Sequence, residues 1–170
     1  MKQIEFDLIN IAIKSRLYKG IKELKKLYQA IIDGDSPLNF YSRCDNIPKT
    51  FTLIKSSGNR RFGGFASEYW KFLSSYAYKD NINAFLFSLD KYKIYPYKKD
   101  ENPLELYEIY DPTFGMGPNS IYTGSSSMKQ KIIPNNESNS SASYNFYGDK
   151  NALSESDGKG INVAEIEVFR

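Results

Sequence analysis

The chain has 170 residues, of which 41% are hydrophobic and 25% are charged, a mixture typical of one globular domain. Its net charge of +3 is too small for a dedicated nucleic-acid-binding protein, and no apolar run is long enough for a transmembrane helix. Cys44 is the only cysteine, which excludes an internal disulfide and suits a reducing compartment. Because Glu5 and Asp7 interrupt the N-terminal apolar residues, no signal peptide is expected. We expect a cytoplasmic location, including the cytosolic face of a membrane complex.

The chain has no histidine. It therefore has neither a Ser-His-Asp triad nor a Cys-His pair, and one cysteine without histidine does not form the usual zinc sites. Residues 114–117 (FGMG) lack the third glycine and the following helix of a dinucleotide site, so they are predicted to form a tight turn. We therefore expect a protein that is not an enzyme, with no catalytic residue, no metal and no cofactor.

Residues 3–32 are predicted to be helical, with Gly20 dividing them into two helices and Gly34 ending the second. The pattern is a set of apolar residues at spacings of three and four, namely Leu17, Ile21, Leu24, Leu27, Tyr28 and Ile31. Residues 1–30 hold seven basic and three acidic side chains. This basic N-terminal region could dock to an acidic partner or a membrane surface, and the alternative is a solvated helix face. The candidates for docking are Lys14, Arg16, Lys19 and Lys22.

A further short helix is predicted from Ser36-Pro37, an N-cap and first-turn pair, to Arg43. From Thr50 the pattern changes to strands. The predicted strands span residues 50–56, 60–65, 83–89, 92–97, 108–110, 120–123 and 162–170. Residues 66–77 are predicted to form a short helix or a loop, and residues 124–143 a long polar loop. Several hairpins and a long return connection predict a mainly β fold, a two-sheet antiparallel β-sandwich with flanking helices.

Two groups of residues are candidates for chemistry. Glu165 and Glu167 lie two apart on the last strand and are expected to face the same side, together with Val163 and Phe169. They are either an acid/base pair that shares a proton or acceptors for a neighbouring loop. Cys44 is either a redox-sensing thiol or a small core residue. The C-terminal end of a helix disfavours its thiolate, which favours the core residue.

The single tryptophan, Trp70, is either a core residue or a binding platform, and Asp45 is expected to be a turn or cap residue. Gly63 and Gly64 lie inside a predicted strand, where glycine marks a bulge or the close approach of another backbone. The last strand is expected to be central in its sheet, because a loose apolar edge would favour aggregation.

Cys44-Asp45, the Gly63-Gly64 pair, Trp70, the turn 114–117 and the last strand follow one another in an order and spacing that resemble a TLDc domain (the TBC/LysM-associated domain of oxidation-resistance proteins). The resemblance covers about residues 17–170, which leaves residues 1–16 as an N-terminal helical extension. Met116 interrupts what is often a longer glycine run in the family, and the loop 125–143 looks expanded. The residues that carry the resemblance are Cys44, Asp45, Phe62, Gly63, Gly64, Trp70, Phe114, Gly115, Gly117, Glu165, Glu167 and Phe169.

The resemblance implies a β-sandwich that binds other proteins. In several members it implies binding and regulation of the vacuolar proton-pumping ATPase, with a link to oxidative-stress resistance. It implies no residue-level active site. We therefore expect a non-catalytic binding module or a subunit of a large assembly, with a protein partner and no nucleic acid. The alternative is an oxidative-stress defence enzyme that uses Glu165 and Glu167 or Cys44.

Overall fold

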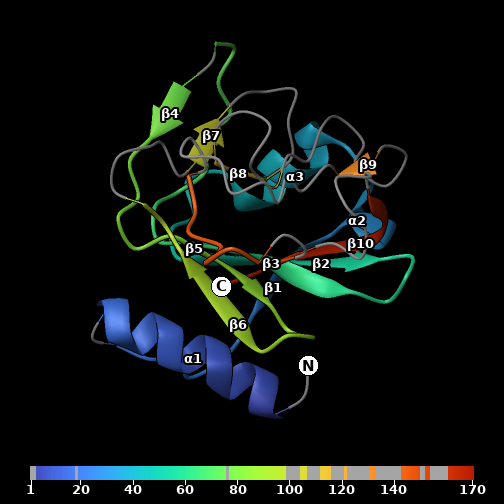
Figure 1. The fold of residues 1–170 in the computed structure, drawn as a ribbon. Helices are drawn as coiled ribbons and strands as arrows, with labels where there is room; N and C mark the ends of the chain where they lie inside the picture. The colour runs from blue at the N-terminus through green and yellow to red at the C-terminus, as the bar shows by residue number, and fades with distance from the viewer. Residues whose placement is uncertain are drawn as a thin grey trace.

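A computed structural model describes residues 3–17, 19–75, 77–98, 104–106, 112–115, 121, 131–132, 143–149, 152–153 and 161–170. These residues form three helices and ten strands (Figure 1). The helices are α1 (Gln3–Leu17), α2 (Ala30–Asp33) and α3 (Pro37–Cys44). The strands are β1 (Lys26–Gln29), β2 (Thr50–Ser56), β3 (Arg61–Ala66), β4 (Ala77–Lys79), β5 (Phe85–Ser88), β6 (Lys93–Pro96), β7 (Leu104–Leu106), β8 (Thr113–Phe114), β9 (Lys131–Ile132) and β10 (Ile161–Phe169).

The described strands pair into two antiparallel sheets. The larger has the order β1-β10-β2-β3-β5-β6, with β9 also pairing to β10, and the smaller has the order β4-β7-β8. In Figure 1, α1 lies below the larger sheet, while α3 and the smaller sheet lie above it. The predicted mainly β fold with flanking helices is confirmed, and the last strand, β10, is central as expected.

The larger sheet has a separate apolar core on each face, because successive side chains of a strand point to opposite faces. On one face, α1 packs against aromatic side chains of β2, β3 and β5. On the other, α3 and the smaller sheet enclose the larger core cluster, which includes Trp70 and Phe114. In β5, Phe85 and Phe87 join the first core, as their spacing predicts, and Leu86 joins the second.

The prediction of a second helix between Gly20 and residue 32 is wrong except for its last turn. The first helix ends at Leu17, residues 19–25 have no regular structure, and Lys26–Gln29 form strand β1 against β10. A single helical turn, α2, follows. Tyr28 is fully buried beside Phe40, with 5.8 Å between ring centroids. Pairing with a distant strand and burial of this ring have overridden the local apolar spacing, which fits a helix equally well.

Other local predictions are confirmed. The hydroxyl of Ser36 accepts a hydrogen bond from the backbone N–H of Asn39 at 3.3 Å and caps α3. Strands β2 and β3 form the predicted hairpin without a bulge, and β5 pairs with β6 across the predicted turn. Residues 67–75 form a loop rather than a helix. The predicted strand 108–110, most of 120–123, Gly117, and the loop 124–143 apart from β9 and Ser143 lie outside the described residues.

Candidate functional site

The two carboxylates of β10 lie on the α1 face of the larger sheet. Glu165 stands opposite Lys55, and Glu167 stands opposite Leu53 of β2. They share this face with Phe169, as predicted, but not with Val163, which packs in the opposite core with Ile166. The prediction for Val163 is wrong because the register shifts between Val163 and Glu165, and such a bulge reverses the alternation of side chains.

Each of these carboxylates has its own partners. Glu165 accepts hydrogen bonds from the Gln29 side chain at 2.9 Å and from the Ile31 backbone N–H at 3.2 Å. Glu167 forms an ion pair with Lys26. The two side chains therefore fasten β1 and α2 to β10, which is the acceptor role expected for a carboxylate beside a neighbouring loop.

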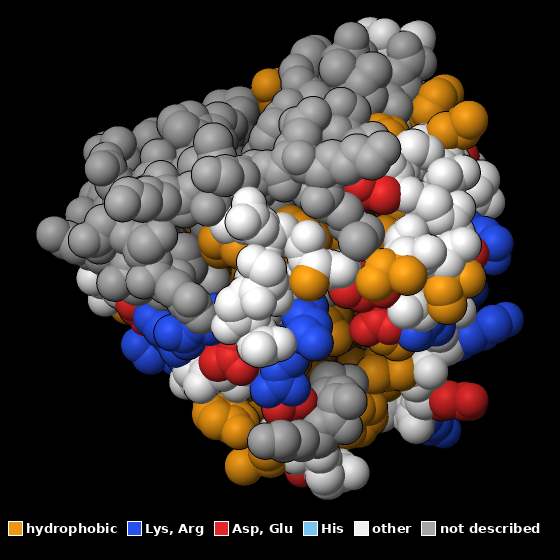
Figure 2. Space-filling view, turned by 90° about the vertical axis from the view of Figure 1, so that its right-hand side faces the viewer, with side chains coloured by type: hydrophobic (Ala, Val, Ile, Leu, Met, Phe, Trp, Pro, Cys, Tyr) orange, Lys and Arg blue, Asp and Glu red, His pale blue; other side chains and the backbone are white. Residues whose placement is uncertain are grey.

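A small pocket of about 190 Å³ lies next to these carboxylates. Its lining carries both signs of charge, and the residues are Glu5, Leu53, Lys55, Arg61, Leu89, Glu165 and Glu167. The fully buried Glu5 of α1 meets the Arg61 guanidinium in two contacts, at 2.7 and 3.0 Å, and Asp90 lies 3.3 Å from the same group. Figure 2 shows that acidic and basic side chains also lie next to one another on one side of the molecular surface. The charged side chains at this pocket therefore connect α1 to the larger sheet through ion pairs.

Cys44 and Trp70 are core residues. The Cys44 side chain is fully buried. Burial, with a smaller effect of the Asp33 carboxylate, raises the pKa of the Cys44 thiol to about 12, so the thiol is neutral at physiological pH. The indole N–H of Trp70 donates a hydrogen bond to the Thr50 hydroxyl at 2.8 Å, and its ring packs edge-on against Phe114 at 5.4 Å.

Asp45 is the C-cap residue of α3, as expected for a turn or cap residue. Its carboxylate accepts a hydrogen bond from the backbone N–H of Phe72 at 2.9 Å, while the neighbouring Asn46 N–H donates to the Trp70 carbonyl at 2.9 Å. These bonds hold the loop 67–75 against the end of α3.

The glycine and phenylalanine motifs meet across the core. A Cβ atom added at Gly63 would lie 1.9 Å from the Thr52 carbonyl oxygen, and one added at Gly64 would lie 2.6 Å from the Phe114 ring. The predicted close approach is therefore confirmed at Gly63, while at Gly64 the neighbour is a side chain. Gly115, next to Phe114, has φ +91°, which favours glycine. The remaining motif residues pack on both faces of the larger sheet. Phe62 is fully buried in the larger core, and the Phe169 ring centroid lies 6.1 Å from that of Phe51 in the smaller core.

A larger hollow, of about 630 Å³, lies at the other end of α1. We call it the basic groove, and its lining residues are Ile13, Leu17, Lys19, Gly20, Ile21, Lys22, Glu23, Leu24, Lys25, Lys49, Phe51, Phe65 and Arg170. Two of the predicted docking residues, Lys19 and Lys22, lie at this groove. The other two do not: Lys14 is exposed elsewhere on α1, and the Arg16 guanidinium lies over the Phe85 ring at 4.9 Å.

The model of the TLDc domain family matches residues 1–170, the whole chain. The chain belongs to the TLDc domain family. A search among curated proteins finds no match. The family match extends over residues 1–16, beyond the range 17–170 in which the sequence resembles a TLDc domain. In this TLDc domain α1 supplies Ile9, Ala12 and Ile13 to the core beneath the sheet.

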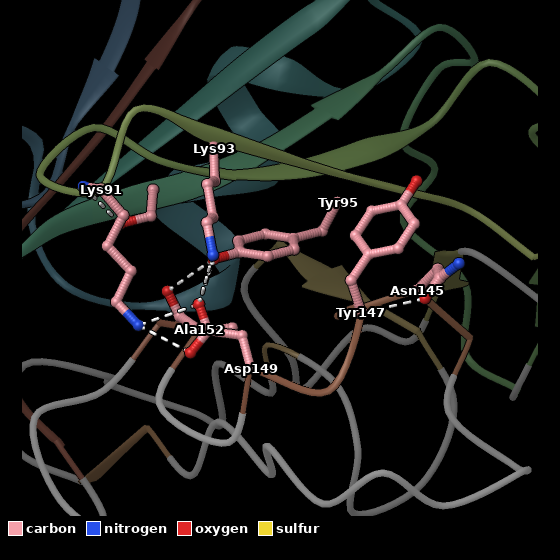
Figure 3. A network of polar contacts seen from close by, with 8 residues as sticks. Lys91, Lys93, Tyr95, Asn145, Tyr147, Asp149 and Ala152 are labelled. Atoms are coloured by element: carbon pink, nitrogen blue, oxygen red, sulfur yellow. Dashed lines mark hydrogen bonds and ion pairs between the residues drawn. The ribbon is translucent and has the colours of Figure 1, made fainter.

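One polar cluster of the TLDc domain was missed by reasoning from the sequence. The Asp149 carboxylate accepts hydrogen bonds from Lys91 at 2.8 and 3.0 Å, from Lys93 at 3.2 Å and from the Tyr95 hydroxyl at 3.2 Å (Figure 3). Burial favours a higher pKa for Asp149, but the two lysines outweigh it and lower the pKa below its ordinary value. The cluster ties the segment 143–149 to β6. The sequence of the basic turn 91–93 does not predict this cluster, because the partner Asp149 lies far along the chain.

In the parts of the chain that the structure describes, no group of three or more acidic, cysteine or histidine side chains is arranged to hold a metal ion. No helix among the same residues has the length and apolar character needed to cross a membrane.

Proposed function

We propose that this TLDc domain is a non-catalytic module that works by binding a protein partner. The observation that carries the proposal is the engagement of the candidate reacting groups. Cys44 is buried with a neutral thiol, and Glu165 and Glu167 each hold β1 or α2 through partners of their own. Groups that are so fixed within the fold support a structural role for the family motif residues.

The surface offers features that suit binding. The basic groove is a concave, largely apolar hollow with cations around it, and its volume of about 630 Å³ falls in the range of sites that take a ligand or an anchoring side chain. The partner that we propose is the vacuolar proton-pumping ATPase or another large cytoplasmic assembly, on the basis of the family resemblance. A role in oxidative-stress resistance would then act through that partner.

The test mixes the purified chain with the detached catalytic sector of the proton-pumping ATPase from the same cells. The mixture is run on a size-exclusion column, and ATP hydrolysis is measured in the fractions. We expect the chain to co-migrate with the sector and to change its hydrolysis rate. Separate elution with an unchanged rate would contradict a role at this ATPase.

A further inference from the structure

The basic groove is formed by α1 and the segment that follows it, together with β2, β3 and the distant Arg170. The C-terminal half of α1 forms one wall and residues 19–25 form the other, while β2 and β3 lie at the bottom. The backbone N–H of Ile21 donates to the Asn10 side chain at 2.6 Å, which holds the segment 19–25 alongside α1. Farther on, Lys25 and Arg170 exchange two backbone hydrogen bonds of 2.8 Å. Hydrogen bonds thus fix the segment 19–25 at Ile21 and at Lys25, and we call this segment the strap.

The floor of the groove is apolar and deeply set. Phe51 and Phe65 are each 2% exposed, and Ile13 is 5% exposed. Leu17, Ile21 and Leu24 are half-buried along the walls. Because the floor is almost completely covered, the half-buried leucine and isoleucine side chains of the walls offer the apolar surface that an inserted side chain would cover on binding.

The rim of the groove is strongly basic. Its exposed charged residues are Lys19, Lys22, Glu23, Lys25, Lys49 and Arg170. Five cations therefore face one anion around an apolar floor. Charges arranged in this way attract an acidic partner and fix how it is oriented, while the apolar floor supplies the buried contact.

We propose that the basic groove binds an acidic segment of the protein partner that inserts one or two large apolar side chains between flanking Asp and Glu residues. This inference rests on the proposed binding function and gives the partner's contact segment its chemistry. Strap residues 22–24 lie between the two fixed points and make no backbone hydrogen bond to other described residues. They can therefore adjust to an inserted side chain at little cost.

A membrane surface fits this groove less well than a peptide does. A bilayer is bound by apolar side chains that protrude, whereas the floor residues Phe51 and Phe65 are sunk below the lysines of the rim. A protruding peptide side chain can contact Leu17, Ile21 and Leu24 and leave its acidic neighbours at the level of the lysines.

The experiment uses a fluorescein-labelled peptide in which one Leu-Phe pair is flanked on each side by four alternating Asp and Glu residues. Its binding to the whole chain is measured by fluorescence anisotropy in about 0.1 M salt, where the Debye length is about 10 Å. Two further peptides serve as probes: one with alanine in place of Leu-Phe, and one with lysine in place of every acid. We expect the first peptide alone to bind, and more weakly as salt is added.

The decisive variant reverses two exposed charges of the rim, Lys19→Glu with Lys22→Glu. The matched control reverses two exposed charges outside the groove, Lys14→Glu with Lys71→Glu. We expect the rim variant to bind the peptide about tenfold more weakly or worse, and the control to stay within about twofold of the wild type, because contact charges matter more than the net charge. Circular dichroism checks that both variants are folded.

Several results would overturn the proposal. They are absence of peptide binding, equal binding of the alanine peptide, equal loss in both variants, and binding of vesicles of phosphatidylserine and phosphatidylcholine in place of the peptide. The rim variant is also run in the co-migration assay. If it co-migrates as the wild type does, the groove proposal fails while the binding function stands. If the peptide binds as expected but the wild-type chain does not co-migrate, the ATPase is the wrong partner and the groove proposal stands.

Discussion

Gly63 and Gly64 are neighbours in β3, yet an added methyl group meets a different obstacle at each. At Gly63 the obstacle is the backbone oxygen of Thr52, which belongs to the paired strand and cannot move alone. At Gly64 it is the ring of Phe114, a side chain held edge-on by Trp70. The two glycines therefore serve opposite faces of one sheet, and only the second is coupled to the phenylalanine-glycine turn.

We predict that Gly64→Ala lowers the free energy of unfolding by about 1–3 kcal/mol, the usual cost of overpacking a core. The cost should shrink in a Phe114→Leu background, because the smaller side chain vacates the space beside the new methyl group. Gly63→Ala is the matched control, and its cost should be the same in both backgrounds. Urea unfolding of the six proteins measures this. Equal costs of Gly64→Ala in the two backgrounds would show that the Phe114 ring is not the obstacle.

Asp149 gives the fold a dependence on acid pH. Its pKa is lowered in the folded protein, so its stabilising effect is fully present above the ordinary value of about 4 and is lost as pH falls through the lowered folded value. We predict that Asp149→Asn lowers the free energy of unfolding by about 1–2 kcal/mol at pH 7, since three polar partners lose a charged acceptor.

The difference between Asp149→Asn and the wild type should narrow as pH falls below about 4. Thermal unfolding from pH 7 to pH 3 measures it, with Asp80→Asn as an exposed control. A difference that stays constant over this range would mean that the lysine contacts of Asp149 do not stabilise the fold.

Among the elements, α1 is joined to the sheet by two kinds of contact. Ile9, Ala12 and Ile13 supply apolar packing along one side of the helix. Near its N-terminus, the buried Glu5 carboxylate pairs with Arg61 of β3 in a two-contact ion pair. Apolar packing alone tolerates sliding, whereas a paired guanidinium and carboxylate fix the position of the helix along the sheet.

We predict that Glu5→Gln lowers the free energy of unfolding by about 2–4 kcal/mol, because the loss of one member leaves the other partly buried without its main counter-charge. Asp7→Asn removes the same charge from an exposed position of the same helix and should change stability by less than about 0.5 kcal/mol. Urea unfolding compares the two variants. Equal stability effects of the two substitutions would show that the ion pair of Glu5 with Arg61 does not fix α1 on the sheet.

For the molecule as a whole, the sequence predicted those elements whose signals are local. The Ser36-Pro37 pair fixed the start of α3, and alternating side chains marked β2, β5 and β10. Strand β1 could not be predicted, because its extended form depends on pairing with β10 from the other end of the chain. The bulge that turns Val163 to the opposite core also has no local signal.

The candidate site was predictable to a similar extent. Lys19 and Lys22 follow from the basic N-terminal segment, and both lie at the groove. Lys49 and Arg170 reach the same rim from distant parts of the sequence, and only the fold brings them there. The acceptor role of Glu165 was among the predicted alternatives, whereas its bonds to Gln29 and Ile31 depend on β1 and α2, where a long helix was predicted.

The central claim is that this TLDc domain acts by binding and not through a reaction at Cys44, Glu165 or Glu167. The most direct measurement titrates the chain into the ATPase catalytic sector and follows ATP hydrolysis, comparing the wild type with the triple variant Cys44→Ala, Glu165→Gln and Glu167→Gln. With folding verified by circular dichroism, we predict the same maximal effect and a half-maximal concentration within about twofold, since none of these side chains lines the groove. Loss of the effect in a folded triple variant would contradict the claim.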